Sequence, residues 1–257
     1  MSKKHGAFVW YELMTTDIEA AEEFYDAVVG WRSEDAGMPG MDYTLFKAGD
    51  VRVAGLMTIP EEAAKMNTPP AWIGYIGVDD VDAAARKIAE LGGKVHRKPD
   101  DIPNIGRFAI VADPHGAVFA LFKGAGDGEM PEIARDAIGN VGWHELMAGD
   151  LSVEFPFYQK LFGWGKDEAM DMGPMGVYQL FTHDGAQIGG MMTKTPEIPA
   201  PYWGYYFNVD ALDAAVERAT SRGAKIVMGP MEVPGGAWVI GGVDPQGAHF
   251  SLVSTKR

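Results

Sequence analysis

Two glutamates, each placed two residues after a tryptophan, are the side chains of this sequence best suited to chemistry. Glu12 follows Trp10 in Trp-Tyr-Glu-Leu-Met, and Glu145 follows Trp143 in Trp-His-Glu-Leu-Met. Both phrases are strand-like, and side chains two apart on a strand share a face. Each carboxylate is therefore expected beside an indole ring, where it could act as a general base or help to bind a cation stacked on the ring.

The repeated phrase belongs to an internal repeat of the whole chain. Trp10 and Trp143 are 133 positions apart, and the same offset relates Phe24-Tyr25 to Phe157-Tyr158. With small shifts, Asp113-Pro-His-Gly matches Asp244-Pro-Gln-Gly. Such ordered matches predict two tandem domains. We place them at 1–124 and 139–257, joined by a linker at 125–138 that is rich in glycine and acidic residues.

The hydrophobic pattern predicts an α+β fold, with strands and helices alternating in the same order in both halves. In the first half a helix opens at Asp17 and closes at Gly30, and a second helix spans 81–91. Strands are expected at 8–14, 43–47, 51–58, 72–78, 94–97, 108–111 and 118–122. Each half thus contains two strand-helix-strand-strand units.

Composition excludes several classes of function. The 257 residues carry a net charge of -14, from 36 acidic and 22 basic side chains, so nucleic acid and anionic membrane surfaces are not expected partners. There is no cysteine, which excludes thiolate metal ligands and cysteine nucleophiles. The N-terminal residues lack a signal-peptide pattern, and we expect a cytoplasmic protein that is a monomer or a homodimer.

The phrases Thr16–Tyr25, Gly77–Ala84 and Asp113–Gly116, repeated in the second half, resemble the vicinal oxygen chelate superfamily. This superfamily includes glyoxalase I, bleomycin-resistance proteins and extradiol dioxygenases. The resemblance covers nearly the whole chain. It implies tandem glyoxalase-like domains, each built of two paired βαβββ modules that curl around a cavity. It also implies a divalent metal held by histidine, glutamate or glutamine side chains.

The positions that match the family's metal ligands carry other residue types in both halves. They are Trp10, Gly55, Ile73 and Ala120 in the first half and Trp143, Gly190, Gly204 and Ser251 in the second. None is a credible ligand, since an indole nitrogen only donates and Gly, Ile and Ala have no side-chain lone pair. The six histidines show no spacing that would preorganise another site. We therefore expect no metal and no cofactor.

If the tryptophans occupy the ligand positions, they point into the cavities, and strand parity places further residues beside them. The predicted binding residues are Trp10, Tyr75, Trp143, Tyr206, His249 and Ser251, with Glu12 and Glu145 as candidate catalytic carboxylates. An aromatic pocket of this kind suits an apolar, aromatic or cationic small molecule. In the alternative, structural interpretation, the tryptophans fill vacated space and each glutamate pairs with an arginine such as Arg107. His115 is interpreted as a turn residue.

Three functions remain open at this point. The first is a metal-independent small-molecule binding protein of the glyoxalase and bleomycin-resistance type. The second is a metal-free lyase- or isomerase-like enzyme, with Glu12 or Glu145 as general base and a tyrosine or His249 as proton donor. The third is a metal-dependent glyoxalase or dioxygenase with atypical ligands. Loss of turnover on changing the glutamates to glutamine would favour the second, and stoichiometric metal would favour the third.

Overall fold

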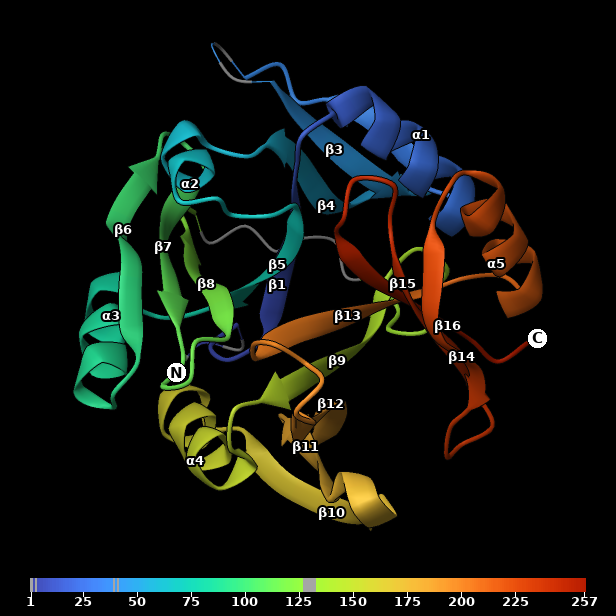
Figure 1. Ribbon diagram of the computed structural model, residues 1–257. Helices are drawn as coiled ribbons and strands as arrows, with labels where there is room; N and C mark the ends of the chain where they lie inside the picture. Colours follow the sequence, from blue (N-terminus) through green and yellow to red (C-terminus); the bar gives the residue numbers. More distant parts are fainter. Residues whose placement is uncertain (1, 3, 39, 41, 127–132) are drawn as a thin grey trace. The chain divides into compact units, whose positions relative to one another are not determined.

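A computed structural model describes the chain except for residues 1, 3, 39, 41 and 127–132 (Figure 1). The chain forms two compact units. Unit 1 holds Met1–Val9, Ile73–Met130 and Trp143–Trp203, and unit 2 holds Trp10–Trp72, Pro131–Gly142 and Gly204–Arg257. Each unit therefore combines one module from the first half of the repeat with one from the second. The predicted linker at 125–138 lies partly outside the described residues.

Unit 2 contains two βαβββ modules. The first has most of β1 (Phe8–Thr15), α1 (Ile18–Val29), β2 (Arg32–Asp35), β3 (Tyr43–Ala48), β4 (Val51–Thr58) and a short α2 (Glu61–Lys65). The second has most of β13 (Tyr202–Asn208), α5 (Leu212–Ser221), β14 (Lys225–Glu232), β15 (Trp238–Val243) and β16 (His249–Ser254). Their strand orders are β2-β3-β4-β1 and β13-β16-β15-β14. Helices α1 and α5 pack against each other (Figure 1).

Unit 1 repeats this arrangement with the other two modules. One has most of β5 (Ala71–Gly77), α3 (Val81–Glu90), β6 (Lys94–Ile102), β7 (Gly106–Ala112) and β8 (Val118–Gly124). The other has most of β9 (Val141–Ala148), α4 (Leu151–Phe162), β10 (Gly165–Asp171), the 3₁₀ turn η1 (Gly173–Met175), β11 (Val177–His183) and β12 (Ala186–Thr193). Their orders are β5-β8-β7-β6 and β10-β11-β12-β9, and α3 packs against α4.

In each module the first strand runs parallel to the last, as in the pairs β1 with β4 and β9 with β12. The predicted α+β class and the repeated βαβββ order are confirmed. The prediction omitted β2 and α2, which are short and polar, so no hydrophobic period marked them. None of the helices in the described part of the chain is long and apolar enough to cross a bilayer.

A buried Trp–Tyr–Asp chain of hydrogen bonds lies in the core of each unit. In unit 2, Trp72 Nε1 donates to Tyr25 Oη at 2.9 Å, and the Tyr25 hydroxyl donates to Asp244 at 3.0 Å. In unit 1, Trp203 Nε1 donates to Tyr158 Oη at 3.0 Å, which donates to Asp113 at 3.1 Å. The aspartates begin the two Asp-Pro-x-Gly turns, which are thereby tied to the helices that carry the tyrosines.

Helix α1 begins and ends where the sequence predicts. The Asp17 side chain accepts a hydrogen bond from the Ala20 backbone amide at 3.1 Å, and Gly30 closes the helix at a φ of 86°, in the left-handed region. Its buried face carries Ala21, Phe24, Tyr25, Val28 and Val29.

We expect Asp17→Ala to lower the free energy of unfolding by about 1 kcal/mol, because one amide of the first turn loses its acceptor. Urea denaturation followed by tryptophan fluorescence measures this loss. Glu23→Ala, an exposed change in the same helix, serves as the control and should cost less than about 0.5 kcal/mol. An equal effect of the two changes would contradict the capping role.

Candidate functional site

The first candidate site, called the Trp10 site, lies in unit 2 and consists of Trp10, Glu12, Tyr43 and Gly55. Trp10 Nε1 donates to the Tyr43 hydroxyl oxygen at 3.1 Å, and this hydroxyl donates to Glu12 Oε2 at 3.0 Å. Trp10 and Glu12 thus share one face of β1, as the strand parity predicted. Glu12 is only 8% exposed, whereas Trp10 and Tyr43 are partly exposed.

Unit 1 carries the same constellation, called the Trp143 site, in Trp143, Glu145, Tyr178 and Gly190. Trp143 Nε1 donates to Tyr178 Oη at 2.8 Å, and Tyr178 also hydrogen-bonds to Glu145. Trp143 packs on the buried group Tyr178, Leu180 and Met192, against which Met147, Met170 and Met172 also pack. Flexible thioethers therefore surround the indole and phenol rings of this site.

The tyrosines explain why glycine stands at positions 55 and 190, which the sequence comparison matched to the second ligand of the family. Gly55 is paired with Glu12 across β4 and β1, and a Cβ added to Gly55 would lie 1.9 Å from the Tyr43 hydroxyl oxygen and 3.2 Å from Trp10 Nε1. A Cβ on Gly190 would lie 2.1 to 2.4 Å from three atoms of the Tyr178 phenol. The tyrosine side chain therefore occupies the space beside the strand that a ligand side chain would need.

Both tyrosine hydroxyls keep their protons at physiological pH. Burial, and after it the neighbouring Glu12, raise the pKa of Tyr43 far above its usual value, and burial and Glu145 do the same to the pKa of Tyr178. In unit 1 the pKa of Tyr202, at the start of β13, is also raised, by burial and then by Glu145. Each glutamate therefore faces a neutral hydroxyl that donates to it.

These residues do not fit the family's metal. The indole nitrogens have no lone pair to offer, the glycines carry no side chain, and the hydroxyls that fill the space are protonated. Ile73 and Ala120 in unit 1, and Gly204 in unit 2, add no donor atom, and Ser251 in unit 2 adds only a neutral hydroxyl. Among the described residues, no three His, Asp or Glu side chains gather in a way that could hold a metal ion.

The other predicted site residues differ in their surroundings. Tyr75 and Tyr206 are both 5% exposed, and Tyr206 is paired with Ser251 across β13 and β16. Ser251 is partly exposed, and His249, two residues earlier on β16, is exposed. The assignment of these four residues to ligand binding stays a prediction.

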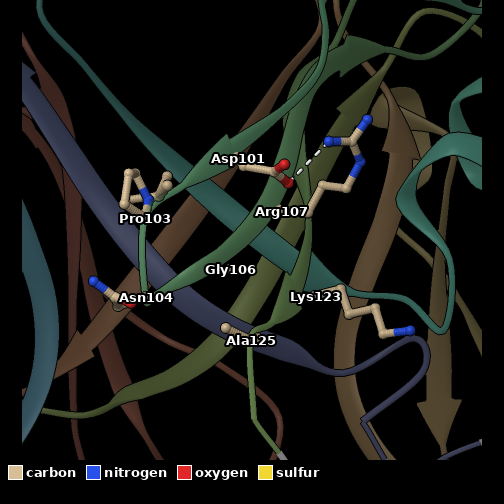
Figure 2. A pocket seen from close by; sticks show the side chains of 9 residues that line it. Asp101, Pro103, Asn104, Gly106, Arg107, Lys123 and Ala125 are labelled. Atoms are coloured by element: carbon tan, nitrogen blue, oxygen red, sulfur yellow. Dashed lines mark hydrogen bonds and ion pairs between the residues drawn. The ribbon is translucent and has the colours of Figure 1, made fainter.

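Arg107, which the structural interpretation offered as a partner for a glutamate, is bound elsewhere. Its guanidinium contacts Asp82 at 2.7 and 3.0 Å and Asp101 at 2.8 Å. Arg107 also lines a surface pocket of about 350 Å³ at the end of β6, β7 and β8, together with Asp101, Asn104 and Lys123 (Figure 2). None of the residues that line this pocket belongs to the Trp10 or the Trp143 site.

Sequence reasoning missed Tyr43 and Tyr178, which join each tryptophan to its glutamate. A signal was present, since the phrase Tyr-Thr-Leu-Phe at 43–46 matches Tyr-Gln-Leu-Phe at 178–181 in the repeat. The tyrosines lie far from the tryptophans in sequence, and only the register of β3 and β4, and of β11 and β12, brings them together. On the opposite face of β9, the His144 ring is stacked on the ring of Phe8, with centroids 3.9 Å apart.

Comparison with known proteins agrees with this architecture. The chain is 30% identical over 253 residues to the protein named "Putative glyoxylase CFP32" of Mycobacterium bovis, covering 97% of this chain and 95% of that one. It is 30% identical over 265 residues to the anthracycline biosynthesis protein DauV of Streptomyces sp. strain C5, covering 98% and 94%. A Mn(II)-bound glyoxalase from Novosphingobium aromaticivorans has the same fold, with a TM-score of 0.66, 17% identity and coverage of 99% and 83%.

The family description covers both halves of the repeat separately. The glyoxalase/bleomycin resistance protein/dioxygenase superfamily matches residues 7–121 and again residues 140–252. Each match begins at the strand that carries the Trp-x-Glu phrase and ends in the strand after the Asp-Pro-x-Gly turn. The repeated βαβββ order and the relatives that align over almost their whole length agree with these matches. This chain therefore belongs to the glyoxalase/bleomycin resistance protein/dioxygenase superfamily.

Proposed function

We propose that this protein binds small aromatic molecules that carry a hydrogen-bond donor or a positive charge, and that it does so without a metal. The observation that carries the proposal is the duplicated Trp–Tyr–Glu constellation, in which each tryptophan stands at a position matched to a metal ligand of the family. The indole offers a surface for stacking, and the carboxylate attracts a donor or a cation. Because the tyrosine holds the carboxylate in place, little side-chain freedom is lost on binding.

Charge and relatives support this ligand class. The net charge of -14 favours cations over anions near the surface. The relative DauV is named for anthracycline biosynthesis, and anthracyclines are planar polycyclic aromatic compounds. An anthracycline with a free amino sugar is therefore a suitable probe, and its N-acetylated form, which lacks the positive charge, is a matched control ligand.

We expect calorimetric titration to show saturable binding of the amino compound by protein from which metals have been removed with a chelator. Glu12→Gln and Glu145→Gln should weaken binding about ten- to a hundredfold at their own site, because a charge-assisted hydrogen bond contributes about 1.5–3 kcal/mol. The N-acetylated probe, which keeps an N–H donor but lacks the positive charge, should lose less affinity in the variants than the amino compound does. Binding that requires added metal, or that is unchanged in both variants, would overturn the proposal.

One observation favours a second candidate function. Each glutamate accepts a hydrogen bond from a protonated tyrosine, so a general base and a proton donor lie in contact. A metal-free enzyme acting on a carbonyl compound could use such a pair. Related chemistry is indicated by the glyoxylase name of the mycobacterial relative. In that case the same glutamine variants should abolish turnover of a 2-oxoaldehyde–thiol adduct while its affinity changes little.

A further inference from the structure

A buried glutamate meets a histidine at one of the two Asp-Pro-x-Gly turns. In unit 1, His115 Nδ1 is hydrogen-bonded to Oε1 of Glu154, which lies on α4. The Glu154 side chain is completely buried, whereas that of His115 is 39% exposed. The contact joins two segments that are far apart in the sequence, the turn at 113–116 and the first turns of α4.

The packing fixes the imidazole in this position. A Cβ added to Gly149, just before α4, would lie 2.3 Å from the His115 Cβ and 2.4 Å from its Cγ. Only glycine leaves room for the ring at this place. The backbone amide of His115 is held as well, because it donates to Asp113 Oδ1 at 3.1 Å.

The matching place in unit 2 has no titratable pair. The repeat replaces His115 by Gln246, Glu154 by Ala21 and Gly149 by Thr16. Gln246 Oε1 accepts hydrogen bonds from the backbone amides of Thr16 at 3.1 Å and Asp17 at 2.7 Å. The turn is thus fastened to α1 by a neutral amide in unit 2, and to α4 by a histidine and a carboxyl group in unit 1.

The carboxyl group of Glu154 has surroundings that disfavour its ionised form. Its second oxygen, Oε2, is buried and has no hydrogen-bond partner among the described residues. Burial, and after it the charge of Asp113, raise the pKa of Glu154 to about 7, while His115 opposes this rise. The other groups that face the pair are Asp150, which interacts with His115, and the Tyr158 hydroxyl, which interacts with Glu154.

We propose that the contact between His115 and Glu154 attaches the turn at 113–116 to helix α4 in unit 1 in a pH-dependent way. We call this contact the latch. While the carboxyl group of Glu154 is protonated, it carries no charge into the core and is hydrogen-bonded to the His115 imidazole. When Glu154 is ionised, two carboxylates, Glu154 and Asp113, remain buried near one another. Their repulsion and lost solvation weaken the attachment of α4.

The latch makes the two units respond differently to pH. Helix α4 follows directly on β9, the strand that carries Trp143 and Glu145. Raising the pH therefore loosens the element next to the Trp143 site, whereas the neutral amide in unit 2 leaves α1 and the Trp10 site unaffected. The latch itself does not depend on the proposed ligand, so it can be tested on the protein alone.

Hydrogen exchange of the full chain, read by mass spectrometry at about pH 5.5 and about pH 8.5 and corrected for intrinsic rates, tests the latch. The folded pKa of Glu154 lies above its unfolded value, so its stabilising contribution is complete below about pH 4.5 and is lost as the pH rises through about 7. We expect exchange at 113–117 and 151–158 to become about tenfold faster at the higher pH. Exchange at 244–248 and 18–25 should change less than about twofold.

The repeat supplies the matched control. The double variant His115→Gln/Glu154→Ala carries the residues of unit 2 and should lose the pH dependence in unit 1, as should Glu154→Gln. A pH dependence that persists in these variants would overturn the proposal. Equal exchange rates at both pH values in unit 1 of the wild type would also overturn the proposal. This test does not depend on the folding of any variant.

Discussion

Asp244→Ala should destabilise the protein by about 3–5 kcal/mol, the largest loss that we expect from a single truncation in either turn. Asp244 is 5% exposed, and its Oδ1 accepts hydrogen bonds from the backbone amides of Gln246, Gly247 and Ala248, each at 2.9 Å. Its Oδ2 accepts one from the Tyr25 hydroxyl at 3.0 Å. Removing the carboxylate leaves the amides of Gln246 and Ala248 and the Tyr25 hydroxyl without an acceptor in a buried turn, while the Gly247 amide keeps the backbone carbonyl of residue 244.

Urea denaturation, with the midpoint and slope compared between variants, measures this loss. Asp244→Asn is the control, because its amide oxygen can still accept from the three backbone amides. We expect it to cost less than half as much. Asp113→Ala should behave like Asp244→Ala, since Asp113 holds the amides of His115, Gly116 and Ala117 and the Tyr158 hydroxyl in the same way. A loss below about 1 kcal/mol for both alanine variants would refute this account.

Gly190→Ala should disrupt the Trp143 site, although it adds a single methyl group. The new Cβ would lie 2.1 Å from Cε1 and 2.2 Å from Cζ of Tyr178, distances that no side chains tolerate. Tyr178 is 8% exposed and packed on Leu180 and Met192, so its ring cannot move aside freely. We expect a stability loss of about 1–3 kcal/mol and the breaking of the Trp143–Tyr178 hydrogen bond.

Two measurements separate the clash from a general weakening of β12. The indole N–H resonance of Trp143 should shift in Gly190→Ala and in Tyr178→Phe, which removes only the hydroxyl. In a Tyr178→Ala background the added methyl group should cost less than about 0.5 kcal/mol, because the clash is gone. If Gly190→Ala cost the same stability in the wild type and in the Tyr178→Ala background, the clash with Tyr178 would not be the reason for glycine at position 190.

Much of the local structure follows from short-range signals in the sequence. Asp17 and Gly30 bound α1 because a carboxylate accepts from a free amide of the first turn and glycine adopts a positive φ. The strand predicted at 51–58, from an apolar run between turn residues, is present with these bounds as β4. The 133-residue repeat identifies the module order, since the same local signals occur twice.

The sequence by itself predicts that the positions matched to the family's metal ligands are poorly suited to a metal, because residue type decides whether a side chain has a lone pair to offer. It also placed each tryptophan beside its glutamate, through the period of two in a strand. The contacts with Tyr43 and Tyr178 were decided by strand register, which joins residues more than 30 positions apart. No local pattern encodes such a pairing.

The tertiary structure alone decided the role of the Asp-Pro-x-Gly turns. From the sequence alone, His115 and Gln246 are both interpreted as polar residues at the same place in a tight turn. Packing sets His115 against the carboxyl group of Glu154, whose pKa is raised by burial, and sets Gln246 against the start of α1. The physical reason is that ionisation depends on burial and on neighbouring charge, and both are fixed by segments that come together only when the chain folds.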